Sequence, residues 1–389
     1  MAESRERSDS ASDPSRRAIL AAGAALAAGC TGAPVAEVGG RRLLPTTEAA
    51  IDAIAAAGGP GQLFVWHDGK TLVDRGFGAG VQAGSLVPWA SACKPTTVAA
   101  VLRLVDAGEV RLDDRVTRFI PAFGEAGKTD ITLRHLMTHT AALGGYAGPR
   151  NLPQWEDTIA QIVAAPRTIQ HGQAAPPPPS ENRPAYNPAG LWILGEVLRI
   201  VHERPFPELI RSEVYLPLDM DDCWNGMPGE RVASYRDNIV RGGFQGSSSG
   251  SADPGTTPAI ALRTNPAGGA VGPLRELGNF YRMALDGGAW RGKRFLEEST
   301  IGEAIAPQAS NGSVWTFGLG FLVNKAPAKA LAPAEQRLRY GQRPSTAAFG
   351  HNGATGTVAF ADPAVGLVVV MIGLPLSVSD GVYAELGLA

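Results

Sequence analysis

The sequence is poor in cysteine and in charged residues. Its 389 residues include three cysteines, Cys30, Cys93 and Cys223, and an odd, scattered set of this kind does not form a disulfide framework. Charged residues make up 19% of the chain and the formal net charge is -2, so no strong field favours nucleic acid or acidic ligands. No internal repeat occurs. These absences argue against a disulfide-stapled domain, a nucleic-acid-binding protein and a repeat array.

Glycine and proline are abundant instead. The chain has 48 glycines and 30 prolines, yet 44% of its residues are hydrophobic. This composition predicts a folded protein with many loops and turns rather than a disordered one. No linker marks a boundary between two domains, so we expect residues 45–389 to form one domain behind an N-terminal segment, residues 1–44.

The N-terminal segment resembles an export signal. Arg16-Arg17 precede a small apolar run that ends at Gly29; the run is too short to span a bilayer but suits a signal peptide. The paired arginines resemble a twin-arginine signal. Residues 27–30, Ala-Ala-Gly-Cys, resemble a bacterial lipobox, although Leu is more usual at position 27. We expect export, with Cys30 as a lipidated membrane anchor; the alternative is a disordered tail on a cytoplasmic enzyme.

Local patterns at the start of the domain predict a helix and then a hairpin. The helix would have Thr46 or Thr47 as its N-cap and would stop at Gly58-Gly59. An Asp-Gly turn then separates residues 62–66 from residues 70–77. Because Asp-Gly accepts the positive φ that tight turns require, these two segments predict a β-hairpin.

The end of the chain predicts further strands of the same sheet. Residues 315–323 alternate like a strand, and residues 357–361 and 366–372 predict a second hairpin that is apolar enough to be central. A terminal helix from about Ser379 would cover one face of the sheet. Further helices are predicted at residues 191–201 and 273–285. The sheet would therefore take strands from both ends of the chain, with a helix-rich insertion between them.

Ser91-Ala92-Cys93-Lys94 carries the strongest chemical signal. A serine hydroxyl needs a base within hydrogen-bond reach to act as a nucleophile. If Ser91 opens a helix, Lys94 lies one turn further along on the same face, and residues 96–105 continue at helical spacing. Unpaired N–H groups of that first turn could also face a developing oxyanion. The alternative is an ordinary helix start with a surface lysine.

Two further residue types near this motif invite other chemistry. Cys93 would lie about 200° around the helix from Ser91, so we expect it to pack in the core rather than to act as the nucleophile. His135 and His139 are four residues apart on a helix that Thr132 would cap, which is metal-ligand spacing. No Glu lies between them and no third ligand stands out, so we expect packing or hydrogen-bonding roles and no metal or organic cofactor.

Several motifs together resemble the serine β-lactamase and penicillin-binding-protein superfamily. They are residues 91–94, LDDRVTRFIP at 112–121, ITLRHLMTHTAAL at 131–143, Tyr186-Asn187, Ala267-Gly268-Gly269 and FGHNGATGTVAFADP at 349–363. The branch they resemble most is the group of class C β-lactamases, D-alanyl-D-alanine carboxypeptidases and family VIII esterases. The resemblance covers residues 45–389. It implies an α/β (α+β) fold, an antiparallel sheet flanked by helices, with a helical lobe inserted at about residues 106–265 and the site between them.

The resemblance also implies roles for individual residues. Ser91 would be the acylated nucleophile and Lys94 its base or proton partner. Tyr186 would match the tyrosine of the family's Y-x-N element, which helps to deprotonate the serine and to protonate the leaving group. The segment His351-Asn352-Gly353 would stand where many members carry K-T-G or H-x-G, and the N–H groups of Ser91 and Ala354 would form the oxyanion hole.

Other positions bear on substrate binding. Position 188 is Pro where Y-x-N has Asn, so an amide that grips the substrate is missing unless Asn187 substitutes. Position 351 is His, so a fixed cation for a substrate carboxylate is absent unless its pKa is raised. Both departures argue against efficient β-lactam or D-Ala-D-Ala recognition. The tryptophans are core residues by default, although Trp155 could line an acyl pocket.

We therefore expect two-step acyl transfer on a small-molecule ester, amide or peptide. The serine would be acylated, and water would then give hydrolysis, whereas an alcohol or amine would give a new ester or amide. Three alternatives stay open: a β-lactamase or D,D-carboxypeptidase, a biosynthetic acyltransferase that acts on a natural product, and a non-catalytic binding protein on the same fold.

Overall fold

The computed structural model describes most of the chain from residue 44 onward. The described residues are 44–78, 80–143, 154–168, 184–235, 238–240, 244, 261–310, 316–324 and 339–388. All of them belong to the unit Val35–Ala389. The twin arginines and Cys30 lie outside them, so export and lipidation stay predictions. None of the helices in these ranges is long and apolar enough to cross a membrane.

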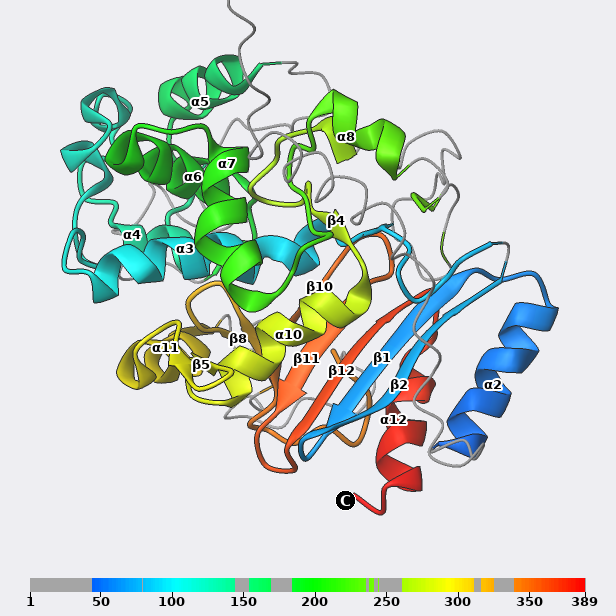
Figure 1. Cartoon of the computed structure of the whole chain (residues 1–389). Helices are drawn as coiled ribbons and strands as arrows, with labels where there is room; N and C mark the ends of the chain where they lie inside the picture. Colours follow the sequence, from blue (N-terminus) through cyan, green and yellow to red (C-terminus); the bar gives the residue numbers. More distant parts are fainter. Residues whose placement is uncertain are drawn as a thin grey trace, which may run out of the picture. The chain divides into compact units, whose positions relative to one another are not determined.

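An eight-stranded antiparallel sheet takes its strands from both ends of the chain (Figure 1). Its order is β2-β1-β12-β11-β10-β9-β8-β7. The strands are β1 (Gly61–His67), β2 (Lys70–Phe77), β7 (Ala309–Ser310), β8 (Thr316–Phe317), β9 (Leu322–Val323), β10 (Phe349–Asn352), β11 (Val358–Asp362) and β12 (Leu367–Ile372). The predicted antiparallel sheet is thus confirmed, and β1 pairs with β12 across some 300 residues of sequence.

The two predicted hairpins form, but the predicted strand at 315–323 is wrong. Asp68 and Gly69 adopt positive φ between β1 and β2, as an Asp-Gly hairpin turn requires. Residues 316–323 instead fold back on themselves as β8 and β9, and Phe317 of β8 pairs with Leu322 of β9. Gly320 has φ +76 in this turn, and a Cβ there would come within 2.5 Å of Val98. Only glycine therefore allows the chain to reverse direction so close to the helix that contains Val98.

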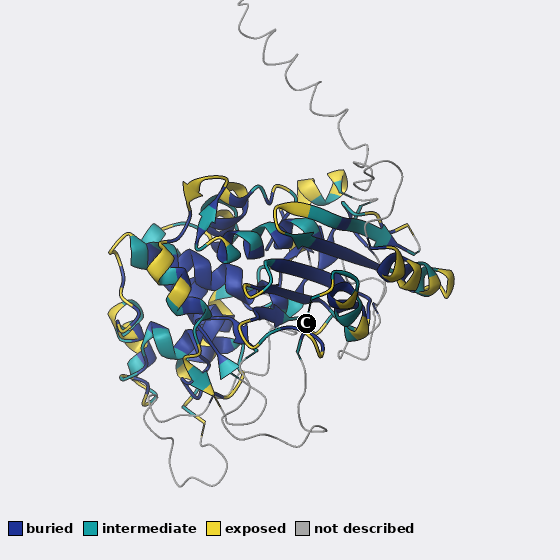
Figure 2. Ribbon diagram, turned by 90° about the horizontal axis from the view of Figure 1, so that it is seen from below, coloured by how far each residue is buried: buried dark blue, intermediate teal, exposed yellow. Residues whose placement is uncertain are grey.

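Helices cover both faces of the sheet. Alternate residues of β12 enter different cores: Val368 and Val370 belong to the core on one face, and Val369 and Met371 to the core on the other, as the period of two in a strand requires. Helix α10 (Leu274–Leu285) covers the first face, and α2 (Pro45–Ala56) and α12 (Leu376–Glu385) cover the second. The central strands β11 and β12 are buried as a result, whereas the edge strand β2 is only partly buried (Figure 2).

Helix α6 is central among the remaining helices, because it contacts four of them. The remaining helices are α3 (Lys94–Asp106), α4 (Leu133–Met137), α5 (Trp155–Ala164), α6 (Ala189–His202), α7 (Phe206–Ile210), α8 (Gly229–Ser234) and α11 (Glu298–Ile305). Short 3-10 or π turns are η1 (Ala90–Cys93), η2 (Val116–Arg118), η3 (Pro121–Gly124), η6 (Arg211–Tyr215) and η7 (Leu216–Leu218). Helix α6 contacts α3, α4, α5 and α7, and its first ten residues are all buried. It therefore forms the centre of the helical packing next to the sheet.

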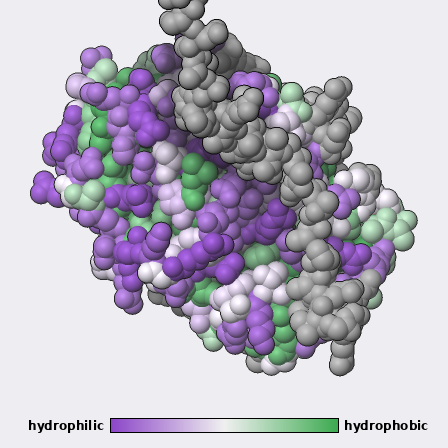
Figure 3. Space-filling model, viewed as in Figure 1, coloured by the Kyte–Doolittle hydropathy of each residue, from purple (hydrophilic) through white to green (hydrophobic). Residues whose placement is uncertain are grey.

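Two small antiparallel pairs complete the described fold. They are β3 (Val87–Pro88) with β4 (Val271–Gly272), and β5 (Ala289–Trp290) with β6 (Lys293–Arg294). Hydrophilic and hydrophobic residues alternate over the face seen in Figure 3. Among the described residues, the large apolar side chains that stay exposed are Tyr186, Ile200, Leu216 and Leu262.

The two ends of the domain are joined by a capping contact that local patterns did not predict. Helix α2 begins at Pro45 with Leu44 as its N-cap, not Thr46 or Thr47. Glu385 of α12 takes the capping role: its carboxylate accepts from Thr46 N at 2.6 Å and from Thr47 N at 2.9 Å. Burial raises the pKa of Glu385, but these hydrogen bonds outweigh burial and lower it. Helix α12 itself begins at Leu376, earlier than the predicted Ser379.

Replacing Glu385 by Gln should lower the free energy of unfolding by about 1 kcal/mol at pH 7, because the amide loses the charge-assisted contact with the first turn of α2. The pKa of Glu385 is lowered in the folded state, so its contribution is present at neutral pH and lost as the pH falls through that lowered pKa. Urea unfolding at pH 7 and pH 3 measures both effects. The control is Glu125→Gln at an exposed position; equal losses in the two variants would contradict the capping role.

Candidate active site

The segment that leads to Ser91 is fixed in position before the chain reaches it. Trp89 N donates to Ala270 O, and its indole N–H donates to Gly272 O, both at 3.0 Å. Ala90 then adopts φ +47, a left-handed conformation that a non-glycine residue keeps only where its surroundings enforce it. Ser91 follows in the 3-10 turn η1 rather than at the start of an α-helix. The turn leads directly into α3 at Lys94, so the predicted spacing is kept.

Lys94 is buried against Ser91. Its Nζ donates to Ser91 Oγ at 2.7 Å and to the carbonyl oxygen of Ala267. The residue is 1% exposed, so the alternative of a surface lysine is wrong. Thr97, one turn further along α3, donates to Pro266 O at 2.8 Å. Lys94 and Thr97 of α3 thus both bind the Pro266–Ala267 segment, whose Ala267 carbonyl accepts the hydrogen bond from Lys94.

Tyr186 reaches Ser91 from the other side. Its hydroxyl donates to Ser91 Oγ at 2.7 Å, and Lys94 Nζ lies 5.0 Å from the centre of its ring. Tyr186 is 38% exposed, so the phenol borders open space while its oxygen points at the serine. Lys94 and Tyr186, which are predicted to act together with Ser91, therefore both lie within hydrogen-bond distance of its Oγ.

His351 lies on β10 beside this group and is 2% exposed. The centres of the His351 and Tyr186 rings are 6.1 Å apart. Its Nδ1 lies 2.8 Å from Asn352 O, and its buried Nε2 has no hydrogen-bond partner within the described part of the chain. Burial, and then the Lys94 cation, lower the pKa of His351 well below its usual value. The imidazole is therefore neutral near pH 7, and the raised pKa that a fixed cation would need is not found.

The turn after β10 is clamped to the segment before Ser91. Thr355 Oγ1 and Thr357 Oγ1 both donate to Pro88 O, at 2.9 and 3.1 Å. A Cβ on Gly353 would lie 2.2 Å from Trp89 O, so only glycine permits this approach. Ala354 follows in the same turn, so the two N–H groups predicted for an oxyanion hole belong to segments held against each other. Their role as a hole stays a prediction.

Three other predicted binding residues are engaged elsewhere in the fold. Asn352 Nδ2 donates to Arg339 O at 2.9 Å. The Asn187 side chain donates to Leu143 O and accepts from Ala189 N at 2.8 Å, so both ends of its amide support the backbone. This arrangement argues against Asn187 replacing the amide that Pro188 removes.

Trp155 is the third. Its indole N–H donates to Glu196 at 2.6 Å, and its ring lies 5.0 Å from Trp192 and 5.6 Å from Phe206, which it stacks on. These contacts place Trp155 in the packing between α5, α6 and α7. They match the default expectation of a core tryptophan better than a role in an acyl pocket.

The structure also brings two residues to the site that sequence reasoning left out. His139 and Phe317 both pack against the Tyr186 ring, with ring centres 4.8 and 6.4 Å away. The sequence predicts a packing or hydrogen-bonding role for His139 without placing it at the site, and it predicts Phe317 only as part of a strand. No group of three or more His, Cys, Asp or Glu side chains among the described residues is placed to hold a metal.

Both described cysteines lie in the core. Cys93 and Cys223 are fully buried, which confirms the expectation that Cys93 faces away from the nucleophile position. Burial raises the pKa of the Cys93 thiol. Because the thiolate is the reactive form, a thiol with these properties is a poor nucleophile.

Comparison with known proteins points to one family. The sequence profile of the Beta-lactamase family matches residues 48–373. The esterase/beta-lactamase LipL of Mycobacterium tuberculosis is 26% identical over 354 residues, which cover 81% of this chain and 76% of LipL. Penicillin-binding protein 4 of Amycolatopsis lactamdurans is 28% identical over 256 residues, 63% of each chain.

Solved structures show the same fold. One is EstCE1, described as a hydrolase with promiscuous acyltransferase activity, with a TM-score of 0.68 and 20% identity over 88% of this chain and 98% of EstCE1. Another is EstA from Arthrobacter nitroguajacolicus, with a TM-score of 0.68 and 18% identity over 91% of this chain and 99% of EstA. The predicted fold, a β-lactamase-like antiparallel sheet with flanking helices, is thereby confirmed.

A fluorophosphonate probe should label the protein at Ser91 alone. Ser91→Ala should abolish labelling, whereas Cys93→Ala should keep most of it, because the buried thiol cannot reach the probe. Intact-mass and peptide-mapping measurements on the two variants check this expectation. Labelling lost in Cys93→Ala and retained in Ser91→Ala would overturn the assignment of the nucleophile.

Acidification should destabilise the fold through its buried histidines. Burial, and then Lys94, lower the pKa of His139 to about 3, so between pH 6.5 and 3 the unfolded chain takes up a proton that the folded chain does not. Stability from this residue is therefore complete above pH 6.5 and lost as the pH falls, by about 2 kcal/mol at pH 5. Urea unfolding at pH 8 and pH 5 should show a smaller difference in His139→Asn than in the wild type. His202→Asn, on the partly exposed end of α6, is the control, and a pH dependence unchanged by His139→Asn would contradict a neutral His139.

Proposed function

The chain belongs to the Beta-lactamase family, a branch of the serine hydrolases, and from this premise we propose that it cleaves a neutral carboxylic ester through an acyl-enzyme on Ser91. One observation carries the proposal: Ser91 Oγ lies 2.7 Å from both Lys94 Nζ and Tyr186 Oη. A hydroxyl held between two groups that can exchange protons is the arrangement that nucleophilic catalysis by serine needs.

The proposed reaction has two steps. In the reactive form of the site the Lys94–Tyr186 pair carries one proton fewer, so Nζ or Oη accepts the Ser91 proton as Oγ attacks the ester carbonyl, and the N–H groups of Ser91 and Ala354 stabilise the oxyanion. Tyr186 then protonates the departing alkoxide, which leaves the acyl group on Ser91. Water enters on the open side of Tyr186, the same pair removes its proton, and the acid is released from the regenerated serine.

The polarity of the site favours neutral substrates. Many family members carry a lysine on the strand where this chain has His351, and that imidazole is uncharged here because burial and Lys94 oppose its protonation. Pro188 carries no amide, and the Asn187 amide is engaged by backbone groups. The carboxylate of a β-lactam or a peptide terminus would therefore meet no cation from this strand, whereas an ester needs none.

Water is the acceptor that this site favours. Tyr186 is 38% exposed, so solvent has access to the acyl-enzyme beside the proton donor. EstCE1 is described as a hydrolase with promiscuous acyltransferase activity. Transfer to an added alcohol is accordingly a secondary outcome of the proposed intermediate.

Steady-state kinetics with p-nitrophenyl butyrate and nitrocefin tests the proposal. We expect rapid ester hydrolysis, little nitrocefin turnover, and a loss of at least about 10⁴-fold in kcat/KM for the ester in Ser91→Ala. Nitrocefin turnover as fast as ester hydrolysis would place the protein with the β-lactamases and peptidases instead. Absence of turnover with both substrates, together with absence of labelling at Ser91, would favour a non-catalytic binding protein.

A further inference from the structure

His139 holds the backbone on both sides of Tyr186. Ala185 N donates to the carbonyl oxygen of His139 at 3.0 Å. On the other side, His139 Nδ1 lies 3.1 Å from Asn187 O and 3.4 Å from Asn187 N. The residues before and after Tyr186 are therefore both held by His139, which lies 47 positions before Tyr186 in the sequence.

The ring of His139 supports the ring of Tyr186 as well. The two ring centres are 4.8 Å apart, and His139 in turn meets Phe317 of β8 edge-on at 4.8 Å. Tyr186 and Phe317 are nearly parallel, with an angle of 14° between their planes. His139 and Phe317 are both buried, so one side of the phenol rests on a rigid aromatic surface while its hydroxyl reaches Ser91.

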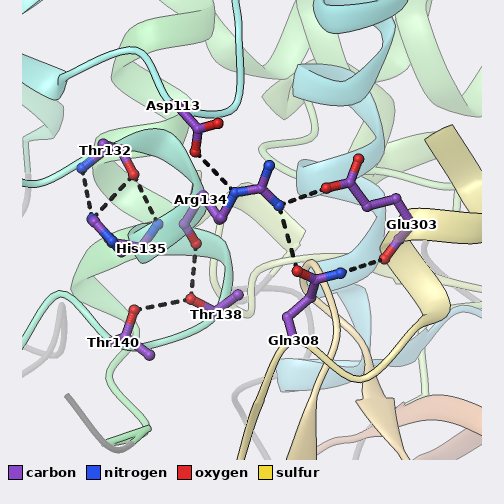
Figure 4. Close-up of polar contacts among 8 residues, drawn as sticks. All are labelled: Asp113, Thr132, Arg134, His135, Thr138, Thr140, Glu303 and Gln308. Atoms are coloured by element: carbon purple, nitrogen blue, oxygen red, sulfur yellow. Dashed lines mark hydrogen bonds and ion pairs between the residues drawn. The ribbon is translucent and has the colours of Figure 1, made fainter. Parts of the chain in front are cut away.

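His139 has an unusual backbone conformation. Its φ is +57, in the left-handed region that residues other than glycine and asparagine avoid. The turn is fixed around it: Thr138 Oγ1 donates to Arg134 O at 2.9 Å and lies 3.0 Å from Thr140 Oγ1 (Figure 4). Thr140 N also donates to His135 O at 3.0 Å. The conformation that points the imidazole at Tyr186 is thus enforced by the end of α4.

Helix α4 is anchored to α11 and the residues that follow it. Arg134 donates to Asp113 at 2.9 Å, to Glu303 at 2.6 Å and to Gln308 at 3.4 Å (Figure 4). At the other end of α4, the Thr132 side chain accepts from His135 N, and His135 Nδ1 accepts from Thr132 N, as the predicted cap at Thr132 requires. His135 therefore serves the helix, whereas His139, four residues later, faces the active site.

We propose that His139 is a positioning residue, which holds the Tyr186 hydroxyl against Ser91 Oγ so that Tyr186 can protonate the leaving group. The proposal rests on the acyl-enzyme function proposed above. His139 itself touches no reacting atom; it fixes the peptide groups and the ring of the residue that does.

Two esters whose leaving groups differ in basicity distinguish a positioning role of His139 from a general contribution to the stability of the fold. An alkoxide cannot depart without a proton, so cleavage of methyl butyrate depends on an accurately placed Tyr186. A p-nitrophenolate departs without this proton. Cleavage of p-nitrophenyl butyrate, which forms the same acyl-enzyme, therefore depends on Tyr186 only through the proton transfers from Ser91 and from water, which Lys94 shares. A variant that merely contains less folded enzyme loses the same fraction of its activity with both esters.

The experiment measures kcat and KM with both esters for His139→Gly, His139→Asn and Tyr186→Phe. Glycine accepts the left-handed φ but removes the ring and Nδ1, whereas asparagine accepts the φ and keeps a polar atom near the Nδ1 position. We expect His139→Gly to lower kcat for methyl butyrate by about 100-fold with KM little changed, and for p-nitrophenyl butyrate by less than about 5-fold. His139→Asn should lose less activity than His139→Gly: its decrease in log kcat for methyl butyrate should be smaller by about a third or more.

Two controls complete the design. His135→Asn changes a histidine of the same helix that does not touch Tyr186, and it should affect both esters equally. In a Tyr186→Phe background, His139→Gly should cause no further selective loss, because the two residues act through one hydroxyl.

The outcomes separate this proposal from the proposed function. Equal losses with both esters in His139→Gly, in an enzyme that a fluorophosphonate still labels at Ser91, would overturn the positioning role and leave the acyl-enzyme intact. Failure of the wild type to be labelled or to cleave either ester would overturn the proposed function itself. If His139→Gly does not fold, a selective loss with methyl butyrate in His139→Asn supports the positioning role, and equal losses there refute it.

Discussion

The burial of Lys94 is the constraint on which the rest of the site depends. Removing an ammonium group from water costs several kcal/mol unless other groups replace its hydration, and among the described residues no carboxylate pairs with Lys94. Its partners are the Ser91 hydroxyl, the Ala267 carbonyl and the face of the Tyr186 ring. Ser91 is a near neighbour in the sequence, but Ala267 and Tyr186 must be brought from distant parts of it, so the loop before β4 and the segment before α6 are both held against the start of α3.

The same cation sets the electrostatics around it. Lys94 contributes to the lowered pKa of both His139 and His351, after burial. Two neutral imidazoles therefore lie beside Tyr186: His139 packs against its ring, and His351 has a buried Nε2 without a hydrogen-bond partner in the part of the chain that the structure describes. In relatives that carry lysine at the strand position, a second cation would be expected there; in this chain that position holds a neutral imidazole beside Ser91, Lys94 and Tyr186. That combination favours an esterase over an enzyme for anionic β-lactams or peptides.

Sequence reasoning succeeded where short-range geometry decides the outcome. The spacing of Ser91 and Lys94, the Asp-Gly hairpin and the Thr132 cap all depend on a few neighbouring residues, and each takes the predicted form. It failed where a distant group overrides the local pattern. Glu385 caps α2 in place of the local threonines, backbone groups occupy the amide of Asn187, and the turn against Val98 divides the strand predicted at 315–323. His139 was missed for the same reason, because only the fold brings it under Tyr186.

The most direct test of the account is to trap the acyl-enzyme. The protein without residues 1–30 would be mixed with p-nitrophenyl butyrate and quenched in acid within a single turnover. It would then be digested and analysed by mass spectrometry. The account predicts a butyryl group on the peptide that contains Ser91, attached to Ser91 itself, and none in Ser91→Ala. Ester turnover that persists in Ser91→Ala, or a butyryl group on another residue such as Cys93, would contradict it.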